Sequence, residues 1–468
     1  MTTLQKYDAI VIGASTAAVS RLCPTLAQAG WKTALIEREH VGGTCVNVGC
    51  MPTKTMVASA RMAYLARRAT EYGIHTGPVN VDLAGVRQRK RDLVSGIRSF
   101  AEGLIEKAQG LDLFRGEASF TGPKAVEVRL NDGGVGQLTA DTIFVDTGAR
   151  PSKPPPIPGL DTVPTLDSTS IMELDTLPEH LLVLGGGYIG VEFGQMFRRF
   201  GSRVTIVQSA KQLLVREDPD VAEEVAKILR EDGMEVLLEA NTLEAGQIED
   251  GQIQLTIGAP AGEQRKLTGS HLLVATGRVP NTERLNLEAA GIETDRNGAI
   301  QVNERLETNV PGVYALGDVK GGPAFTHVAY NDFYILRTNL LEGGNATTTG
   351  RLVPQTVFMD PQLARIGLTE TEARAQRRNI RVAKLPMSAV LRALDVGETR
   401  GFMKAIVDAD SNQILGAVIL GIEAGEIMTV VQVAMMGNLP YTTIRDGIFS
   451  HPTLAEGLNV LFGPMGMQ

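Results

Sequence analysis

The sequence predicts a multidomain α/β protein in which one strand–turn–helix–strand unit occurs twice. Three observations predict this fold class. The chain has 468 residues, enough for about three domains. Two short apolar runs each end in a turn of small residues, and these turns begin at Gly13 and Gly185, 172 positions apart. The distance from the first glycine to the end of the next strand is 24 residues in one copy and 23 in the other.

Composition limits the function classes. Hydrophobic residues make up 43% of the chain and charged residues 21%, values that exclude wholesale disorder. A net charge of −8 argues against nucleic acid or an anionic membrane as the main partner. No apolar run is long enough for a membrane span, and the first residues lack a signal-peptide layout. Three cysteines cannot form a secreted disulfide framework, so we expect a cytoplasmic enzyme.

The first copy of the unit carries a degraded glycine turn. Apolar residues 9–12 lead into Gly13, and the next strand, 33–36, ends at Glu37. Ser15 stands where the glycine closest to a bound phosphate is expected, and Glu37 stands where a carboxylate binds a ribose. On the motif alone, a dinucleotide site and a turn that binds nothing both remain open.

The second copy carries the full fingerprint. A strand at 180–184 runs into Gly185, Gly187 and Gly190, and a helix and a second strand at 204–207 follow. The first glycine permits the tight turn, the second lets the backbone approach a pyrophosphate, and the third packs the helix on the strand. This context favours a dinucleotide site over an ordinary turn.

The end of that second strand bears on the choice of nicotinamide cofactor. The residue there is Gln208, with Lys211 close behind. An acid at this position would bind the ribose of NAD and repel a 2′-phosphate. Its absence favours NADPH over NADH, and the alternative is a solvent-facing loop indifferent to the cofactor.

Other segments fill in the organisation of the chain. A long polar helix is expected at about 84–110, and the prolines of 151–158 indicate a stiff boundary. The tail from about residue 346 alternates short strand-like runs with helices and contains no nucleotide turn. Further strands are expected at 142–145, 272–275 and 312–316.

The sharpest local feature is the pair Cys45 and Cys50. In a regular helix, residues five apart have Cα atoms about 8–9 Å from each other, beyond the ~7 Å limit for a disulfide. A bonded pair therefore requires a distorted segment, which Gly49 and Pro52 favour. Zinc is disfavoured because no second Cys or His pair lies nearby. A redox-active pair, its thiolate stabilised by Lys54 and a helix N-terminus, explains the segment better than packed thiols.

Five further residues are weighed between a functional and an ordinary interpretation. His451 with Glu456 forms a plausible acid–base unit for thiol chemistry, although a surface histidine is the commoner case. Glu192 is by itself a first-turn helix acid. Asp318 either binds a cofactor hydroxyl or caps a turn. Cys23 is expected to be a packed small hydrophobe.

With these motifs in this order, the chain resembles the flavin-dependent pyridine nucleotide–disulfide oxidoreductases, which include dihydrolipoyl dehydrogenase, glutathione reductase and mercuric reductase. The resemblance covers nearly all residues, and it includes A-T-G-R-x-P-N at 275–281. It implies two Rossmann-like dinucleotide-binding domains and a C-terminal α+β dimerisation domain. The implied boundaries are 1–157 with 277–345 for FAD, 158–276 for NAD(P)H, and 346–468 for dimerisation.

The resemblance also implies residue roles. Cys50 is expected to face the flavin and Cys45 to attack the substrate, while Lys54 and Glu192 form an ion pair where the nicotinamide docks. His451, steered by Glu456, is expected to serve the active site of the partner subunit, which implies a homodimer. Asp318 would bind the ribityl chain, and the backbone at 328–329 would approach the flavin pyrimidine. The positions expected to contact FAD or the nicotinamide cofactor are Gly13, Ser15, Glu37, Gly43, Thr44, Lys54, Gly116, Ala118, Thr147, Gly148, Gly185, Gly187, Tyr188, Ile189, Gly190, Gln208, Gly277, Arg278, Gly317, Asp318, Val328 and Ala329.

Departures from the family pattern separate the alternatives. The stretches 216–219 and 392–402 look most like mercuric reductase and its relatives that reduce metal ions or respond to oxidants. The C-terminal residues lack the vicinal cysteines of mercuric reductase, and no metal-binding domain is expected ahead of the core, so a disulfide or another small oxidant is the expected substrate. Dihydrolipoyl dehydrogenase is the alternative, with Phe449 in place of a frequent histidine. A remote alternative is a nucleotide sensor that lost FAD through Ser15.

Overall fold

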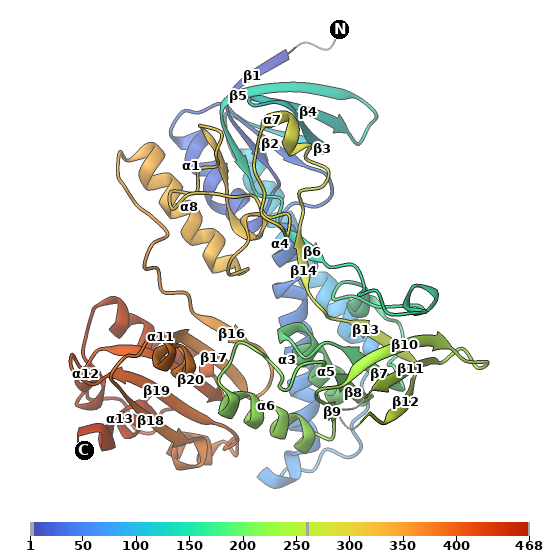
Figure 1. Ribbon diagram of the computed structural model, residues 1–468, viewed down its shortest axis with the longest axis vertical. Coiled ribbons are helices and arrows are strands. Elements are labelled where there is room, and N and C mark those ends of the chain that lie inside the picture. Colours follow the sequence, from blue (N-terminus) through green and yellow to red (C-terminus); the bar gives the residue numbers. More distant parts are fainter. Residues whose placement is uncertain (1–3, 259–261, 467–468) are drawn as a thin grey trace. The chain divides into compact units, whose positions relative to one another are not determined.

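The computed structural model describes residues 4–258 and 262–466, and the chain divides into two compact units. The first comprises Met1–Thr55, Gly85–Lys153 and Gly277–Arg351. The second comprises Met56–Ala84, Pro154–Thr276 and Leu352–Gln468. Each unit therefore combines segments that lie far apart in the sequence, as the interleaved colours of Figure 1 show.

The first unit is built around a six-stranded sheet with the order β1-β2-β3-β4-β5-β15, in which β1 also pairs with β5. The pairs β1–β2, β1–β5, β2–β3 and β5–β15 are parallel, whereas β4 pairs antiparallel with β3 and β5. The strand bounds are Leu4–Ile12 for β1, Thr33–Glu37 for β2, Leu111–Gly122 for β3, Ala125–Leu130 for β4, Val135–Val145 for β5 and Val313–Ala315 for β15. A short antiparallel pair joins β6 (Ala149–Pro151) to β14 (Arg278–Pro280).

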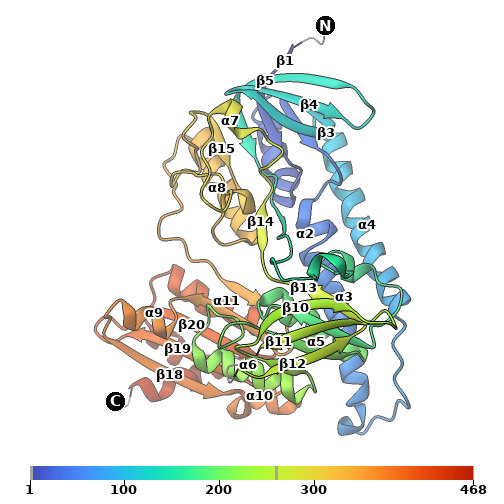
Figure 2. The same ribbon diagram turned by 45° about the vertical axis from the view of Figure 1, so that its right-hand side comes forward.

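Both faces of this sheet are covered, because alternate residues of β1 enter different apolar clusters. Ile10 packs in an apolar cluster with residues of β3, β4 and β5. Val11 packs in a second cluster with residues of the helical segment 18–28 and of α8 (Thr326–Leu341). Figure 2 shows the same chain turned, with β3, β4 and β5 side by side in the first unit. The helices with residues in this unit are α1 (Cys23–Gln28), α2 (Gly43–Asn47), α3 (Cys50–Arg67), α4 (Leu83–Lys107), α7 (Leu287–Ala290) and α8 (Thr326–Leu341). Helices α3 and α4 also contribute residues to the second unit.

The second unit contains a parallel sheet with the order β13-β7-β8-β9. Its strands are β7 (His180–Leu184), β8 (Arg203–Val207), β9 (Glu235–Leu237) and β13 (His271–Val274), with helices α5 (Tyr188–Phe200) and α6 (Pro219–Glu231) in the connections. A separate antiparallel sheet follows α6 along the chain, made of β10 (Asn241–Gln247), β11 (Ile253–Gly258) and β12 (Gln264–Gly269).

The tail of the second unit forms a five-stranded antiparallel sheet with the order β16-β17-β20-β19-β18. Its strands are β16 (Gln355–Val357), β17 (Gln362–Gly367), β18 (Ile380–Pro386), β19 (Phe402–Asp408) and β20 (Ile414–Gly421). The helices are α9 (Glu370–Ala375), α10 (Leu391–Asp395), α11 (Ala424–Met436), α12 (Tyr441–Arg445) and α13 (Gly457–Phe462). Apolar side chains of α11 and α13 join those of the sheet in one buried cluster.

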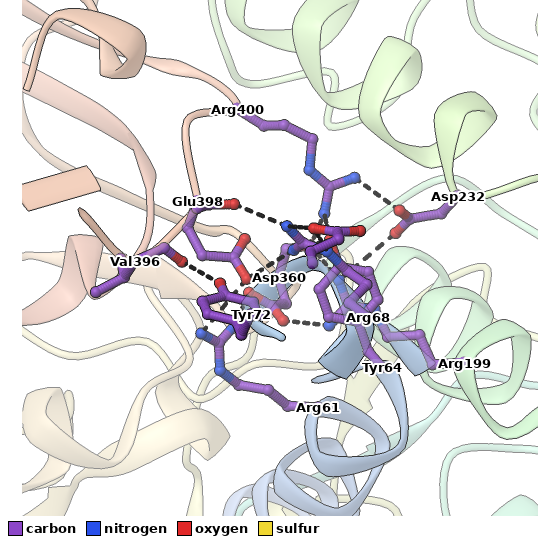
Figure 3. Close-up of polar contacts among 12 residues, drawn as sticks. Arg61, Tyr64, Arg68, Tyr72, Arg199, Asp232, Asp360, Val396, Glu398 and Arg400 are labelled. Atoms are coloured by element: carbon purple, nitrogen blue, oxygen red, sulfur yellow. Dashed lines mark hydrogen bonds and ion pairs between the residues drawn. The ribbon is translucent and has the colours of Figure 1, made fainter. Parts of the chain in front are cut away.

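A buried ion network ties α3 and α5 to the tail within the second unit (Figure 3). Asp360, which lies just before β17, accepts from Arg61 of α3 at 2.5 Å and pairs with Arg199 of α5. Arg68, the residue directly after α3, pairs at 3.0 Å with Glu398 in the loop before β19. Segments from three regions of the sequence are thus held by charge as well as by apolar packing.

The two expected repeat units are confirmed by these elements. Strand β1, the helical segment 18–28 and β2 form the first, and β7, α5 and β8 form the second. The long helix expected at 84–110 is α4, and the expected strands at 142–145, 272–275 and 312–316 correspond to the end of β5, β13 and β15. The region 111–130 carried no expectation, and it forms the β3–β4 hairpin.

Candidate active site

The turn after β1 has the geometry of a phosphate cradle. Gly13 has a φ of +102°, and a Cβ there would lie 2.3 Å from the Asp146 carbonyl oxygen, so only glycine fits. A Cβ on Gly43 would lie 3.0 Å from the Cα of Ser15, so the backbone of 42–43 passes close over the turn. Gly13 and the Gly42–Gly43 pair thus bring two stretches of backbone close together at the expected FAD position. This arrangement of residues fits a bound pyrophosphate.

Two acidic side chains organise this turn from within. The Glu37 carboxylate accepts from the backbone N–H of Ala14 at 2.9 Å, which fixes the end of β2 against the turn. The Ser15 hydroxyl contacts the Asp146 carboxyl and accepts from the N–H of Ala18 at 3.2 Å. Sequence reasoning missed Asp146, because it lies 131 positions from Ser15 and forms part of no spaced motif.

The Gly317–Asp318 segment follows β15 and is held by buried charge. Asp332 of α8 is fully buried, accepts from the N–H of Gly317 at 3.0 Å and pairs with Lys320 at 3.2 Å. Burial raises the pKa of Asp318, and Arg278 and Lys320 oppose that rise. These contacts hold the Gly317–Asp318 segment in place, with the Asp318 carboxyl near the charges of Arg278 and Lys320.

The Thr147–Gly148 pair is joined to the A-T-G-R-x-P-N motif. The Thr147 hydroxyl donates to the carbonyl of Asn281 at 2.8 Å, and the Asn281 amide donates back to the carbonyl of Thr147 at 2.8 Å. Gly148 has a φ of +67° and accepts from the N–H of Asn281 at 3.0 Å. Two motifs that are distant in the sequence are therefore joined by hydrogen bonds, and the joining residue of the second motif is Asn281.

Two expected FAD positions have a packing explanation. Gly116 lies in β3, where a Cβ would be 2.4 Å from the Arg129 carbonyl oxygen of β4. Ala118, two residues on, is buried in the apolar cluster of the first unit. Close approach of two strands accounts for these small residues without a ligand.

The cysteine pair flanks a break between two helices. Helix α2 ends at Asn47 and α3 begins at Cys50, with Val48 and Gly49 outside both, so the predicted distortion is confirmed. The Asn47 amide donates to the carbonyl of Gly43 at 2.9 Å and holds α2 onto the loop before it. None of the three cysteines, all of which lie in the described residues, forms a disulfide bond, and Cys50 is exposed while Cys45 is half-buried.

The thiols of Cys45 and Cys50 lie within hydrogen-bonding distance of each other, and both contact the hydroxyl of Thr326. The Cys50 sulfur lies 3.7 Å from the hydroxyl of Thr326, the first residue of α8. Hydrogen bonding with Cys50 and burial both raise the pKa of the Cys45 thiol, whereas hydrogen bonds with Thr326 and Thr16 lower it. The third thiol, Cys23, is fully buried in an apolar cluster, as predicted.

The glycines of the turn after β7 differ in their surroundings: two are tightly packed and one faces open space. A Cβ on Gly185 would lie 2.6 Å from the Ala275 carbonyl oxygen, and one on Gly190 would lie 2.0 Å from the Gly185 carbonyl oxygen. At Gly187, which precedes the first residue of α5, nothing lies within 4 Å of an added Cβ. The middle glycine is therefore free of protein contacts on the side where a dinucleotide backbone would approach, and the site fits that ligand.

Neighbouring side chains hold this turn in place by hydrogen bonds and packing. The Gln208 amide oxygen accepts from the N–H of Gly186 at 3.1 Å, and its nitrogen donates to the carbonyl of Gln212 at 3.1 Å. Gly186 was not among the predicted contact residues. A Cβ on it would lie 2.4 Å from Cδ2 of Leu213, so a larger residue would clash there. The Tyr188 hydroxyl donates to Gln355 at 3.2 Å.

The remaining candidate residues lie on elements of both units. Lys54 lies on α3 in the first unit, and Glu192 lies on α5 in the second, where its carboxylate accepts from the N–H of Phe358 at 2.7 Å. His451 lies in the second unit, with its Nδ1 3.0 Å from both carboxylate oxygens of Glu456. The other expected contact positions lie in α2 (Thr44), in α5 (Ile189), at the start of α8 (Val328 and Ala329) and at β14 (Gly277 and Arg278).

The described residues contain neither a metal-binding cluster nor a helix suited to span a membrane. Across 4–258 and 262–466, no three His, Cys, Asp or Glu side chains are grouped to hold a metal ion. Within the same residues, no helix combines the length and the apolar character that a membrane crossing requires.

Comparison with known proteins places these features in a family. Residues 7–332 match the pyridine nucleotide-disulphide oxidoreductase family, and residues 353–461 match the dimerisation domain of that family. The probable pyridine nucleotide-disulfide oxidoreductase RclA of Escherichia coli strain K12 is 40% identical over 463 residues, which cover 98% of this chain and 99% of the relative. The solved structure of RclA, described as an HOCl-induced flavoprotein disulfide reductase in a Cu(II) complex, has a TM-score of 0.89 and 39% identity, and the match covers 98% of this chain and 99% of that one.

Other relatives have different named activities. Mercuric reductase of Bacillus cereus is 37% identical over 97% of this chain and 70% of the relative. Dihydrolipoyl dehydrogenase of Chlamydia trachomatis serovar D is 33% identical over 97% of this chain and 95% of the relative. The family uses FAD and a pyridine nucleotide, in agreement with the two glycine turns. The chain belongs to the pyridine nucleotide-disulphide oxidoreductases.

Proposed function

We propose that this oxidoreductase passes electrons from NAD(P)H through FAD to a disulfide between Cys45 and Cys50, and from there to a small oxidant. The observation that carries the proposal is the position of the cysteine pair. The two thiols flank a helix break in the same unit as a glycine turn that fits FAD. FAD, when bound, accepts a hydride from the nicotinamide and passes two electrons to the disulfide.

The two cysteines have separate roles in this proposal. Cys50 faces the flavin, because its sulfur contacts Thr326, two residues before the backbone of Val328–Ala329 that we assign to the flavin pyrimidine. Cys45 is the thiol that attacks the substrate. Reduction of the pair breaks its sulfur–sulfur bond and takes up two electrons, and reduction of a substrate disulfide by thiol exchange restores that bond.

The domain assignment follows the same scheme. We assign 1–157 and 277–345 to FAD, with the expected contact residues of that region, and 158–276 to the nicotinamide cofactor. In this assignment Lys54 and Glu192 keep the roles beside the flavin that the family resemblance implies for them. NADPH is the favoured cofactor, because the residue directly after β8 is Gln208 rather than an acid, and Lys211 is exposed in the following loop. A cytoplasmic location fits a chain with three free thiols.

A homodimer completes the site in this proposal. Residues 353–461 match a dimerisation domain, and the tail exposes large apolar side chains on its helices and loops. Such side chains in numbers indicate a protein–protein surface. They are Val433, Met436, Leu439, Ile448 and Val460. The His451 imidazole, oriented by Glu456, then exchanges a proton with Cys45 of the partner subunit and with the substrate.

Two oxidant classes have specific support. The flavoprotein disulfide reductase relative favours a disulfide, and the mercuric reductases together with the Cu(II) complex of RclA favour a metal ion. Reduction of Cu(II) would convert two Cu(II) ions to Cu(I) while the dithiol becomes a disulfide. Dihydrolipoyl dehydrogenase activity is the remaining candidate, supported by relatives such as that of Chlamydia trachomatis.

The test is an anaerobic reaction of the FAD-loaded enzyme. Reduction with NADPH or NADH is followed by reoxidation with glutathione disulfide, lipoamide, Hg(II), Cu(II) or a quinone. We expect rapid reoxidation by a disulfide or a metal ion, and its loss in Cys45→Ser. Turnover of dihydrolipoamide with NAD⁺ as the fastest reaction would instead establish the dehydrogenase, and reoxidation that is unaffected by Cys45→Ser would contradict the proposed route.

A further inference from the structure

A buried acid touches the expected FAD turn. Asp146 directly follows β5 with 4% of its surface exposed, and its carboxyl oxygen Oδ2 contacts the hydroxyl of Ser15. The same hydroxyl accepts from the N–H of Ala18 at 3.2 Å. Ser15 replaces the glycine at which the cofactor phosphates come closest in this type of turn.

The direction of the Ser15–Asp146 hydrogen bond decides what the turn offers a ligand. A serine hydroxyl has one proton and two lone pairs, and the N–H of Ala18 occupies one lone pair. If Asp146 is ionised, the serine proton points to the carboxylate and only a lone pair remains for a ligand. If Asp146 carries a proton, that proton fills the second lone pair and the serine proton is free. The heavy-atom contact is the same in both states.

The surroundings favour the protonated state. Burial raises the pKa of Asp146 well above its usual value, and its contact with Ser15 opposes that rise. Three further carboxyls raise it as well, those of Asp318, Asp332 and Glu37, and the thiol of Cys23 on α1 also faces Asp146.

The nearby cations are engaged elsewhere. Lys320 and Arg351 pair with Asp332, at 3.2 Å and 2.7 Å. Arg278 acts on Asp318 rather than on Asp146. No cation is thus paired with Asp146 among the contacts of the described residues.

We infer that Ser15 and Asp146 form a proton-linked positioning pair for the FAD pyrophosphate. With a proton on Asp146, the pair presents the serine hydroxyl as a donor to the phosphate, and without it the pair presents only lone pairs and negative charge. The inference rests on the proposed function, since it requires FAD at this turn. Loss of the second glycine of the motif is then offset by a donor that the buried acid controls.

Because FAD binding and protonation of Asp146 are linked, the affinity for FAD should depend on pH. If FAD binds the protonated pair, binding takes up a proton wherever Asp146 is partly ionised in the FAD-free protein. The dissociation constant of FAD then rises with pH, by up to about tenfold per pH unit. Asparagine at position 146 carries an amide N–H in place of the carboxyl proton, so Asp146→Asn should bind FAD with little pH dependence.

The experiment measures FAD dissociation constants by flavin fluorescence on the FAD-free protein, from about pH 6 to about pH 9. We expect weakening with pH in the wild type and a flat profile in Asp146→Asn. Asp112→Asn is the matched control, because its carboxyl also accepts from a hydroxyl, that of Tyr7 at 2.8 Å, in the same unit. It should keep the wild-type profile.

Calorimetry of FAD binding to the wild type in two buffers of different ionisation enthalpy gives a second readout, which needs no variant to fold. Proton uptake close to one at the alkaline end supports the pair. A pH-independent dissociation constant without proton uptake, or an unchanged profile in Asp146→Asn, would overturn the pair and leave the proposed function intact. Failure of the wild type to bind FAD at any pH would instead overturn the proposed function.

Discussion

The shared hydroxyl at the cysteine pair gives a prediction for a single residue. Thr326 lies 3.7 Å from the sulfur of Cys50 and lowers the pKa of the Cys45 thiol. Removing a hydrogen bond to a charged group costs about 1 kcal/mol or more, so Thr326→Val should destabilise the thiolate. In the reduced, FAD-loaded enzyme, we expect the pH profile for alkylation of Cys45 by iodoacetamide to lie at higher pH than in the wild type.

Thr326→Ser is the control, because it keeps the hydroxyl, and it should titrate with the wild type. A valine variant with an unshifted titration would show that this hydroxyl does not act on the thiolate.

Sequence reasoning at this scale succeeded where a spacing carries a physical constraint. The helix break between Cys45 and Cys50 was predictable, because a regular helix holds residues five apart too far from each other. Thr326 and Asp146 were not predictable. They reach the site from positions more than 100 residues away, and single polar residues have no period or spacing that reveals a tertiary contact.

The second glycine turn gives a prediction for an element. Gly187→Ala places a methyl group in open space, so we expect the free energy of unfolding to change by about 1 kcal/mol at most. The same methyl group occupies the path of the dinucleotide backbone, so the KM for NADPH should rise about tenfold or more. Steady-state kinetics and urea unfolding check the two parts.

Gly190→Ala is the opposite case. Its methyl group would lie 2.0 Å from the carbonyl oxygen of Gly185, which should cost about 2 kcal/mol or more of stability. If the two alanine variants behaved alike in unfolding and in KM, the division of the turn between packing and binding would be wrong.

At the scale of elements, the repeated units were the most predictable part of the chain. Their short apolar strands end directly at glycine, and the spacing recurs, so β1 and β2 and also β7 and β8 were expected in place. The hairpin of β3 and β4 and the small sheet of β10 to β12 were not anticipated. These strands are amphipathic and carry no nucleotide turn, and their pairing depends on partners that the local pattern does not name.

The ion network of the second unit gives a prediction for the molecule as a whole. Asp360 lies between Arg61 and Arg199, and Tyr64 packs its ring 3.9 Å from the Arg199 guanidinium (Figure 3). Asp360→Asn removes the nearest carboxylate from two largely buried guanidinium groups, which keep only longer contacts with Glu398 (Arg61, 3.9 Å) and Asp232 (Arg199, 3.7 Å). The substitution should cost about 3–5 kcal/mol of unfolding free energy. Urea unfolding at neutral pH measures the change.

The effect should depend on pH with a definite sign. Burial raises the pKa of Asp360, but the two arginines outweigh burial and hold it below its usual value. The stabilisation is therefore present above the unfolded pKa of about 3.9 and is lost as the pH falls through the lower folded value. Asp395→Asn is the control, because its pairing with Arg392 at 3.7 Å is exposed, and it should change stability by about 0.5 kcal/mol at most. Equal effects of the two variants would show that the network adds nothing to stability.

The assembly of each unit from distant segments was only partly predictable. The proline-rich stretch at 151–158 indicated a boundary, and the first unit does end one of its segments at Lys153. The family resemblance alone implied that 277–345 joins 1–157, because no local pattern names strand pairing such as that of β5 with β15.

The central claim is that the disulfide of Cys45 and Cys50 exchanges electrons with FAD. Anaerobic titration of the FAD-loaded enzyme with NADPH tests it most directly. The account predicts two equivalents of NADPH for full reduction, with a long-wavelength absorbance band appearing after the first equivalent, before the flavin is bleached. Full bleaching by one equivalent without that band, as the account expects only for Cys50→Ser, would contradict it.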